Sequence, residues 1–277
     1  MEGIKKHPIL VPYDFTPVSD VALAHAAGYS QICGNPIIIL NIVDDSTLKF
    51  LKHHNQIDQF LNTKLKGISE EITNKYNVKT SFLIRKGNII SIRNIAEELA
   101  ISIMFIGIDQ PQTLASKVLK VVGSSPAPVY VVQGEIQWKE IRTLVFPVDD
   151  FEETRQKISC TVKLAKETNA KVKLLSITLE DRDRQLSQEV RVKQIEKILF
   201  ENRIPFTTEY AKQKEKNFAD ELLEYAQLNN GDIFILMKTP RTFFPNLFIS
   251  PVDKKVLLNS NNIPSIYINP RDVGRYN

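Results

Sequence analysis

One short motif occurs twice in the chain, and the spacing of the two copies limits the folds that its 277 residues can adopt. The first copy, at residues 9–14, reads Ile-Leu-Val-Pro-Tyr-Asp, and the second, at residues 144–149, reads Leu-Val-Phe-Pro-Val-Asp. Pro12 and Pro147 are therefore 135 residues apart (147 − 12). A repeat of that period predicts two copies of one domain. Each copy is long enough to bury a hydrophobic core.

The two copies are joined by a polar segment, residues 133–140, that contains Trp138, the single tryptophan of the chain. We take this segment as the linker, and we expect one domain at residues 1–136 and the other at residues 140–277. Hydrophobic residues make up 43% of the chain and charged residues 25%, so each half has the composition of an ordinary globular domain.

In both halves, short apolar runs alternate with stretches whose apolar residues recur every three or four positions. The runs are typical of buried strands, and the stretches are typical of amphipathic helices. The expected strands are residues 9–11, 37–43, 78–84, 103–107 and 128–132 in the first half, and 143–148, 172–177, 206–210, 232–237 and 265–268 in the second. This alternation predicts an α/β fold, in which a mostly parallel sheet carries helices on both faces.

Local signals mark the ends of the first helix. Thr16 is a suitable N-cap residue, and Pro17 is suited to the first helical position. Gly34, with Pro36 beyond it, is typical of a helix C-terminus. We therefore expect a helix of small residues between Pro17 and Gly34.

Charge and cysteine content exclude several classes of protein. The formal net charge of +4 is shared by both halves, whereas domains that bind nucleic acid concentrate positive charge on one face, so we expect no nucleic-acid partner. Cys33 and Cys160 occupy non-equivalent places in the repeat and predict no disulfide framework, which fits a reducing cytosol. No apolar run near the N-terminus is long enough for a signal peptide or a membrane span. We expect a cytoplasmic protein without a membrane partner.

These residues resemble the universal stress protein family in its tandem form. The resemblance rests on the motif at residues 9–14, on Pro-Ala-Pro-Val-Tyr-Val-Val at residues 126–132, and on their counterparts in the second half. It implies two tandem five-stranded parallel open sheets of strand order 3-2-1-4-5, of the adenine nucleotide alpha hydrolase-like type. It also implies a stress-response protein that acts by binding or interaction, with a protein partner that the sequence does not name.

The same resemblance implies how the halves assemble. Members of the family commonly pair through the last strand, so we expect an intramolecular pseudo-dimer through the strands at residues 129–132 and 265–268. Both are short, apolar strands at a sheet edge, and such edges need covering. A homodimer is the alternative assembly.

One branch of the family binds ATP through a loop that reads Gly, two residues, Gly, nine residues, then Gly with Ser or Thr. Glycines in such a loop let backbone N–H groups approach phosphate at a helix N-terminus. In the first half Gly107 matches the first glycine, but Gln110 stands at the second, Asp109 adds a negative charge, and the segment before Pro128 is too short. Gly123-Ser124 imitates the closing pair but lies too close to the fifth strand.

The second half keeps the length of this loop and loses its chemistry. Met237 and Pro240 stand where the first two glycines belong, and Ser250-Pro251 replaces the closing pair. The two prolines have no backbone N–H to donate. We therefore expect no functioning ATP loop in either half and no resident cofactor.

If an adenine nucleotide does bind, the resemblance carries its contacts to Pro12, Asp14, Val43 and Gly107 in the first half. Ligands of open α/β sheets bind at the carboxyl ends of the strands, which agrees with these positions. The alternative is that Asp14, like Asp149 in the second half, only ends a strand and caps the next helix. The alternative function is accordingly an adenine-nucleotide sensor, for ATP or AMP, that works through the first domain.

Other polar residues give weaker signals. Lys238 and Arg241 flank the altered loop of the second half and could hold an anion, or could be solvated loop charges. The adjacent His53 and His54 point to different faces of a helix and cannot share a metal ion. We expect His25 to be a packed or a surface histidine.

The chain also carries Tyr130 and Tyr267 at matching places in the two fifth strands, where packing explains them better than chemistry. We find no Ser-His-Asp arrangement and no metal-spaced cluster of Cys and His in the sequence. The sequence therefore predicts neither catalytic residues nor a metal site, and we expect the protein not to be an enzyme.

Overall fold

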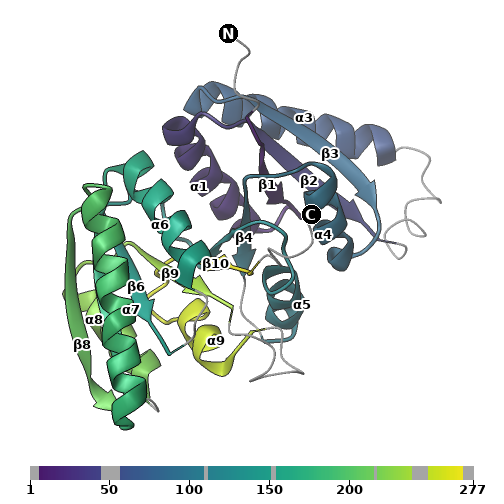
Figure 1. Cartoon of the computed structure of the whole chain (residues 1–277). Helices are drawn as coiled ribbons and strands as arrows, with labels where there is room; N and C mark the ends of the chain where they lie inside the picture. The colour runs from purple at the N-terminus through teal and green to yellow at the C-terminus, as the bar shows by residue number, and fades with distance from the viewer. Residues whose placement is uncertain are drawn as a thin grey trace, which may run out of the picture. The chain divides into compact units, whose positions relative to one another are not determined.

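A computed structural model describes residues 6–44, 57–108, 112–150, 154–214, 217–238 and 249–270 (Figure 1). The chain forms two compact units, unit 1 at Met1–Lys139 and unit 2 at Glu140–Asn277. In the described residues, each unit has five parallel strands with helices on both faces, which confirms the predicted α/β fold.

The strands of unit 1 are β1 (Ile9–Pro12), β2 (Ile37–Val43), β3 (Thr80–Lys86), β4 (Ile103–Ile108) and β5 (Val129–Gln133). They pair in the order β3-β2-β1-β4-β5, and every pair is parallel. This is the order 3-2-1-4-5 that the resemblance implies. The central strand β1 is apolar because both of its faces are covered, and the residues Ile9, Leu10 and Val11 are fully buried.

The helices of unit 1 are α1 (Pro17–Cys33), α3 (Ile57–Tyr76), α4 (Ile92–Glu98, preceded by the 3-10 turn Ile89–Ser91) and α5 (Gln112–Val122). Helix α1 packs on β1 and β4 and also contacts α3, whereas α5 packs on β4 beside the turn that precedes α4 (Figure 1). The two pairs of helices thus cover opposite faces of the sheet, as right-handed crossovers require.

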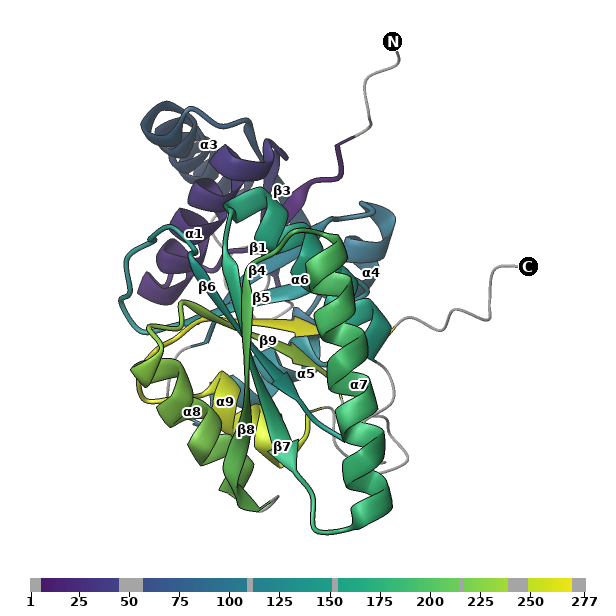
Figure 2. The same ribbon diagram turned by 60° about the vertical axis from the view of Figure 1, so that its left-hand side comes forward.

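Unit 2 repeats this plan. Its strands are β6 (Thr143–Val148), β7 (Lys171–Thr178), β8 (Phe206–Lys214), β9 (Ile233–Met237) and β10 (Ser265–Ile268), in the order β8-β7-β6-β9-β10. Its helices are α6 (Thr154–Thr168), α7 (Arg182–Glu201), α8 (Phe218–Leu228) and α9 (Pro251–Leu257). Figure 2 shows α7 on one face of β7 and β8, with α8 and α9 on the other.

The strand register repeats with the period of the sequence. In unit 1 Leu10 lies opposite Ile38, and in unit 2 Val145 lies opposite Lys173. Both partners are displaced by 135 residues (145 − 10 and 173 − 38). The repeated motif therefore occupies the same place in each sheet.

The predicted helix signals are confirmed. The Thr16 side chain accepts a hydrogen bond from the Ser19 N–H, and Pro17 is the first helical residue. Gly34 ends α1 in the left-handed conformation, at φ 69°.

The edge strands differ from prediction, because β3 is shifted to Thr80–Lys86 and β8 extends to Lys214. An edge strand is covered less completely than a central one, so an apolar run does not mark its ends.

The segment that follows β5 is fixed to unit 1. The indole ring of Trp138 lies over Gly28 of α1, where a Cβ atom would be 2.2 Å from the indole Nε1. The same ring meets the imidazole of His25 edge-on, with 5.5 Å between the ring centroids. The Ile136 carbonyl oxygen lies 3.1 Å from the Nε2 of His25. We call residues 134–139 the strap.

We predict opposite effects for the same substitution at two helical glycines. Gly28→Ala would force the Trp138 ring away from α1 and should lower the free energy of unfolding by about 1–3 kcal/mol. Gly67→Ala is the matched control, since no atom lies within 4 Å of its added methyl group. It should raise that free energy by about 0.5–1 kcal/mol through helix propensity. Urea denaturation followed by circular dichroism measures both, and stabilisation by Gly28→Ala would contradict the packing described here.

Candidate functional site

The sequence-derived site residues of unit 1 meet at the carboxyl ends of the strands. Pro12 ends β1 opposite Leu40, and Val43 ends β2 three residues further on. Gly107 lies in β4 three residues beyond Met104, the partner of Leu10 in β1. The three strand ends, with Asp14 two residues beyond Pro12, therefore share one edge of the sheet, where open α/β folds bind ligands.

Asp14 shapes the turn between β1 and α1. Its Oδ1 accepts hydrogen bonds from the Thr16 N–H at 3.1 Å and from the Thr16 hydroxyl at 2.6 Å. Thr16 in turn caps α1. Phe15 between them has φ 66°, a left-handed conformation that costs about 1–2 kcal/mol in a residue other than glycine. Asp14 thus supports the entry to α1, although its side chain remains exposed.

Val43 and Gly107 also have structural roles. The Val43 carbonyl accepts the Gly87 N–H at 3.0 Å, which ties the end of β2 to the turn after β3. A Cβ atom on Gly107 would lie 2.5 Å from the Val18 carbonyl oxygen in the first turn of α1. The absence of a side chain at Gly107 is therefore explained by the close approach of α1 to β4.

The end of α5 explains the Gly123-Ser124 pair, which resembles the closing pair of an ATP loop. The Gly123 N–H donates to the Leu119 carbonyl at 2.9 Å, and the Ser124 hydroxyl donates to the Lys120 carbonyl at 2.7 Å. Gly123-Ser124 thus closes the C-terminus of α5. Residues 109–111, which include Asp109 and Gln110, lie outside the described residues.

The carbonyl group at the carboxyl end of the first strand finds its hydrogen-bond donor differently in the two units. In unit 1 the Asn41 amide donates to the Tyr13 carbonyl at 2.8 Å. Ser176 stands at the place of Asn41 (176 − 41 = 135), and its hydroxyl donates to the Ile177 carbonyl at 3.2 Å instead. The carbonyl of Val148, the counterpart of Tyr13, therefore takes its donor from another element.

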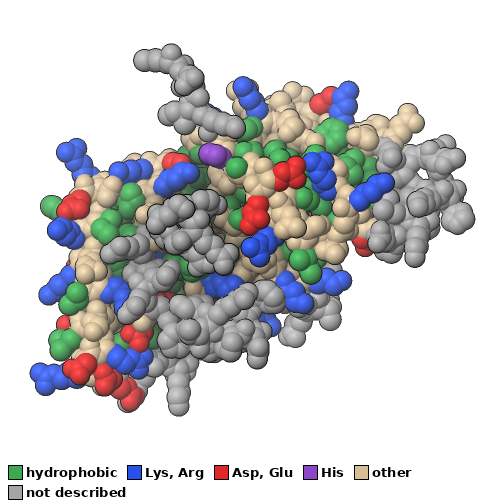
Figure 3. Space-filling model, turned by 45° about the vertical axis from the view of Figure 1, so that its right-hand side comes forward, with side chains coloured by type: hydrophobic (Ala, Val, Ile, Leu, Met, Phe, Trp, Pro, Cys, Tyr) green, Lys and Arg blue, Asp and Glu red, His purple; other side chains and the backbone are tan. Residues whose placement is uncertain are grey.

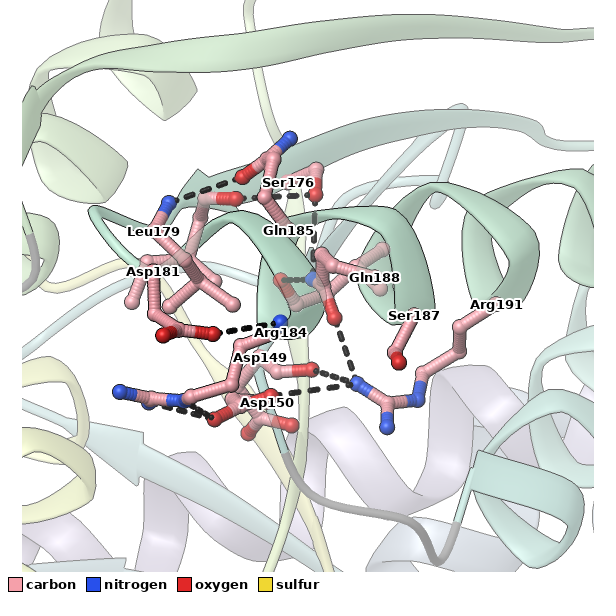
Figure 4. A network of polar contacts seen from close by, with 12 residues as sticks. Asp149, Asp150, Ser176, Leu179, Asp181, Arg184, Gln185, Ser187, Gln188 and Arg191 are labelled. Atoms are coloured by element: carbon pink, nitrogen blue, oxygen red, sulfur yellow. Dashed lines mark hydrogen bonds and ion pairs between the residues drawn. The ribbon is translucent and has the colours of Figure 1, made fainter.

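That donor is Gln188 of α7, whose side chain is fully buried. Its Nε2 donates to the Val148 carbonyl at 2.7 Å and to the Ser176 hydroxyl at 3.1 Å (Figure 4). Its Oε1 accepts from Arg191 Nη1 at 2.5 Å. Every polar atom of this amide is bonded to unit 2.

Two arginines of α7 complete the network in Figure 4. Arg191 also donates to the Asp149 carbonyl at 3.0 Å. Arg184 donates from Nε and Nη2 to Asp150 Oδ2 at 2.8 and 2.5 Å. Side chains of α7 thus occupy the ends of β6 and β7, and Asp149 contributes its backbone to this closure.

The polar network of α7 was not predicted from the sequence. Its signal was present, because Arg184, Gln188 and Arg191 follow the spacing of four and three that puts residues on one helix face. We predicted a helix here from its apolar residues alone. Periodic polar residues on an inward face could have revealed buried partners.

A second buried cluster lies beside the β6 end of unit 2. Lys157 is 2% exposed, and its ammonium group donates to the Pro147 carbonyl at 2.5 Å and lies 4.3 Å from the Phe146 ring centroid. Ala22 stands at the equivalent place in unit 1 (157 − 22 = 135). Loss of hydration on burial lowers the pKa of Lys157, which the nearby Asp149 carboxylate partly offsets.

Asp253, in the first turn of α9, belongs to the same cluster and is 7% exposed. Its backbone N–H donates to the Ser250 hydroxyl at 3.0 Å, and its Oδ2 accepts from the Tyr267 hydroxyl at 3.3 Å. Burial raises the pKa of this carboxyl from 3.8 to about 7, and hydrogen bonding with Ser250 opposes the rise.

The two matching tyrosines pack in the cores of their units, as predicted. Tyr267 is fully buried against Asp253, and Tyr130 stacks on Phe105 with 4.4 Å between ring centroids. The Tyr130 hydroxyl lies 3.3 Å from Nδ1 of His25, which is 2% exposed. His25 is therefore a packed histidine, and burial lowers its pKa from 6.5 to about 4.

The remaining candidates add no site. The Lys238 N–H donates to the Ile268 carbonyl at 2.9 Å, directly after β9. His53, His54 and Arg241 lie outside the described residues. On the face shown in Figure 3, basic side chains lie among acidic and apolar ones, as on an ordinary solvated surface.

The described ranges contain no three His, Cys, Asp or Glu side chains that come together as a metal ion would require. Likewise, none of the helices described is long and apolar enough to cross a membrane.

We predict that Gln188→Ala lowers the free energy of unfolding by about 1–3 kcal/mol, because the buried Val148 carbonyl loses its donor. Adding Ser176→Asn should recover part of this loss, since unit 1 uses asparagine at that place. The exposed Gln194 gives the control, and Gln194→Ala should change stability by less than about 0.5 kcal/mol. Urea midpoints compare the three variants, and equal losses for Gln188→Ala and Gln194→Ala would count against the network.

A pH dependence is expected from His25. The unfolded chain takes up a proton near pH 6.5, whereas the folded protein resists it until about pH 4. The contribution of His25 to the free energy of unfolding is therefore fully present above pH 6.5. It is lost as the pH falls to about 4, by about 3 kcal/mol in total. In thermal denaturation between pH 4 and 7, the Tm of His25→Gln should change less with pH than the Tm of His7→Gln, which replaces an exposed histidine. Identical slopes would refute the assignment.

The sequence and the fold were both found to be similar to known proteins. The sequence pattern described as the universal stress protein family matches residues 6–133. A universal stress protein from Archaeoglobus fulgidus DSM 4304 superposes with a TM-score of 0.73 at 14% identity, over 96% of this chain and 99% of that one. A candidate universal stress protein from Pseudomonas aeruginosa UCBPP-PA14 gives 0.64 at 14% identity, over 96% and 94%.

The two-unit fold also resembles the cytoplasmic domain of a prokaryotic cation chloride cotransporter, with a TM-score of 0.54 at 11% identity over 95% of each chain. At these identities the structural likenesses describe the fold alone. No curated protein matches the sequence.

Proposed function

We propose that this chain, whose residues 6–133 match the universal stress protein family, is a stress-response protein that acts by binding or interaction, without using an ATP loop. The hydrogen bonds of Gln188 support the proposal most strongly. In unit 2 this amide already bonds the Val148 carbonyl at the strand end, where a nucleoside would otherwise dock. A ligand there would have to displace Gln188 together with Arg191, which is bonded to it.

The phosphate side of unit 2 supports the same conclusion. ATP-binding relatives hold phosphate with several backbone N–H groups at a helix N-terminus. Here α9 begins with the Ser250 cap and Pro251, which has no N–H, and the Ser250 hydroxyl already accepts the Asp253 N–H. The carboxyl group of Asp253 would also repel phosphate in its ionised form.

Unit 1 offers half of a site. Its β1 end keeps the exposed Asp14 side chain beside Pro12, and this observation favours the second candidate function, an adenine-nucleotide sensor. Against it, Gly107 is explained by packing against α1 and Gly123 by the end of α5. The glycines that suggest a phosphate loop therefore have other roles in this unit.

We extend the proposal to three further points. The protein acts without catalysis, since the polar clusters described above hold structure together and present no nucleophile beside a base. It works in the cytoplasm, since Cys33 and Cys160 occupy non-equivalent places in the repeat and predict no disulfide framework. Pairing through β5 and β10, with a homodimer as the alternative, stays a prediction.

The test is a thermal denaturation series with millimolar Mg-ATP, Mg-ADP and AMP. We expect no shift in Tm beyond that of matched magnesium and phosphate controls. A site with a Kd one hundredfold below the ligand concentration would add about 2.7 kcal/mol, which is readily seen. Chromatography of the denatured protein should likewise release no adenine nucleotide.

Two variants make the outcome decisive. Asp14→Ala removes an exposed carboxylate at the strand ends of unit 1, and Glu70→Ala removes an exposed carboxylate of α3 as a control. A saturable shift that Asp14→Ala abolishes and Glu70→Ala retains would establish the nucleotide sensor in place of our proposal. In cells that lack the protein, Asp14→Ala should restore stress survival as well as the wild type does.

A further inference from the structure

Lys157 and Asp253 are buried charged groups that the proposed function does not use. They come from α6 and α9, and they lie with Tyr267 of β10 beside the end of β6. Each is almost inaccessible to water, with 2% of Lys157 and 7% of Asp253 exposed. Ionisable side chains are rarely buried so completely, because the charged form loses its hydration.

The partners of Lys157 compensate this loss only in part. Its ammonium group bonds one carbonyl, that of Pro147, and faces the Phe146 ring. The carboxylates of Asp149 and Asp253 act on it at longer range. A close ion pair would have fixed both charges, whereas this spacing leaves each group free to change its protonation.

Asp253 also links α9 to β10 of unit 2. Through its backbone it caps α9 at Ser250, and through Oδ2 it accepts the hydroxyl of Tyr267 in β10. A protonated carboxyl group suits this buried place better than a carboxylate, because it carries no charge and can still accept the Tyr267 hydroxyl.

We propose that the Lys157–Asp253 cluster is a proton-operated latch, which holds α9 closed on unit 2 when Asp253 carries a proton and loosens it as the pH rises toward neutrality. This inference goes beyond the proposed function and does not depend on it. It gives the protein a direct response to acidification.

The groups that face Asp253 set the direction of this response. Lys157 favours its charged form, Asp149 opposes it, and the hydroxyls of Ser250 and Tyr267 bond it. On α8, Asp220 pairs with Lys255 of α9 at 2.6 Å, and both side chains are half exposed. That surface pair makes a suitable control.

The sign follows from proton linkage. Asp253 titrates near pH 7 in the closed state and near 3.8 when α9 opens and the carboxyl group meets water. Below pH 3.8 its preference for the closed state is complete, and above pH 7 that preference is gone. Between these limits, the equilibrium constant for opening α9 should rise about tenfold for each pH unit.

Hydrogen–deuterium exchange of the full chain tests the latch. After division by the intrinsic exchange rate, amides of α9 should show an opening constant that rises about fiftyfold from pH 5 to pH 7. Asp253→Asn should abolish this rise, because asparagine does not titrate. Lys157→Met keeps the buried volume but removes the positive charge, so it should move the end of the rise to higher pH.

The surface pair of Asp220 with Lys255 gives the control. Asp220→Asn removes this pair between α8 and α9 and should leave the pH dependence of α9 opening unchanged. If Asp253→Asn does not fold, the carboxyl carbon of Asp253 can be titrated by NMR in the wild-type protein. A midpoint between pH 6 and 8 supports the latch. A midpoint below pH 5, or a rise in opening that persists in Asp253→Asn, overturns it.

Discussion

The backbone carbonyl at the carboxyl end of the first strand of each sheet needs a hydrogen-bond donor, and much of the rest follows from which residue provides it. The group is buried, so leaving it without a partner would cost about 1–3 kcal/mol. In unit 1 Asn41 of the neighbouring strand bonds the Tyr13 carbonyl. In unit 2 Ser176 bonds elsewhere, and Gln188 of α7 takes over. One exchanged strand residue thus recruits a helix to the strand ends.

The use of Gln188 makes the strand ends of the two units chemically different. Gln188 brings Arg191 with it, and Arg184 holds Asp150 nearby, so α7 closes this edge of the sheet in unit 2, whereas the Asp14 side chain of unit 1 is exposed. Lys157 has appeared where unit 1 has Ala22. The fold is kept because both copies share their strand register, whereas the polar chemistry at the strand ends has changed. This agrees with the general rule that folds persist while sites change.

The sequence allowed prediction of whatever depends on local pattern. The period of 135 residues foretold the matching registers of β1 and β6, and Thr16 and Gly34 foretold the ends of α1. It did not reveal the α7 network, because Gln188 bonds a carbonyl 40 residues away and no local rule selects that partner. The packing role of Gly107 was missed for the same reason, since it depends on where Val18 lies.

The strap has a consequence for dividing the chain into halves. Trp138 comes after the last strand of unit 1, yet its ring fills the surface of α1 left open by Gly28. A fragment that stopped at the end of β5 would lose this indole and expose Gly28 and the His25 ring, which the indole contacts. Core surface that is newly exposed in this way favours self-association. Anyone expressing the first half alone should therefore retain the chain through Lys139.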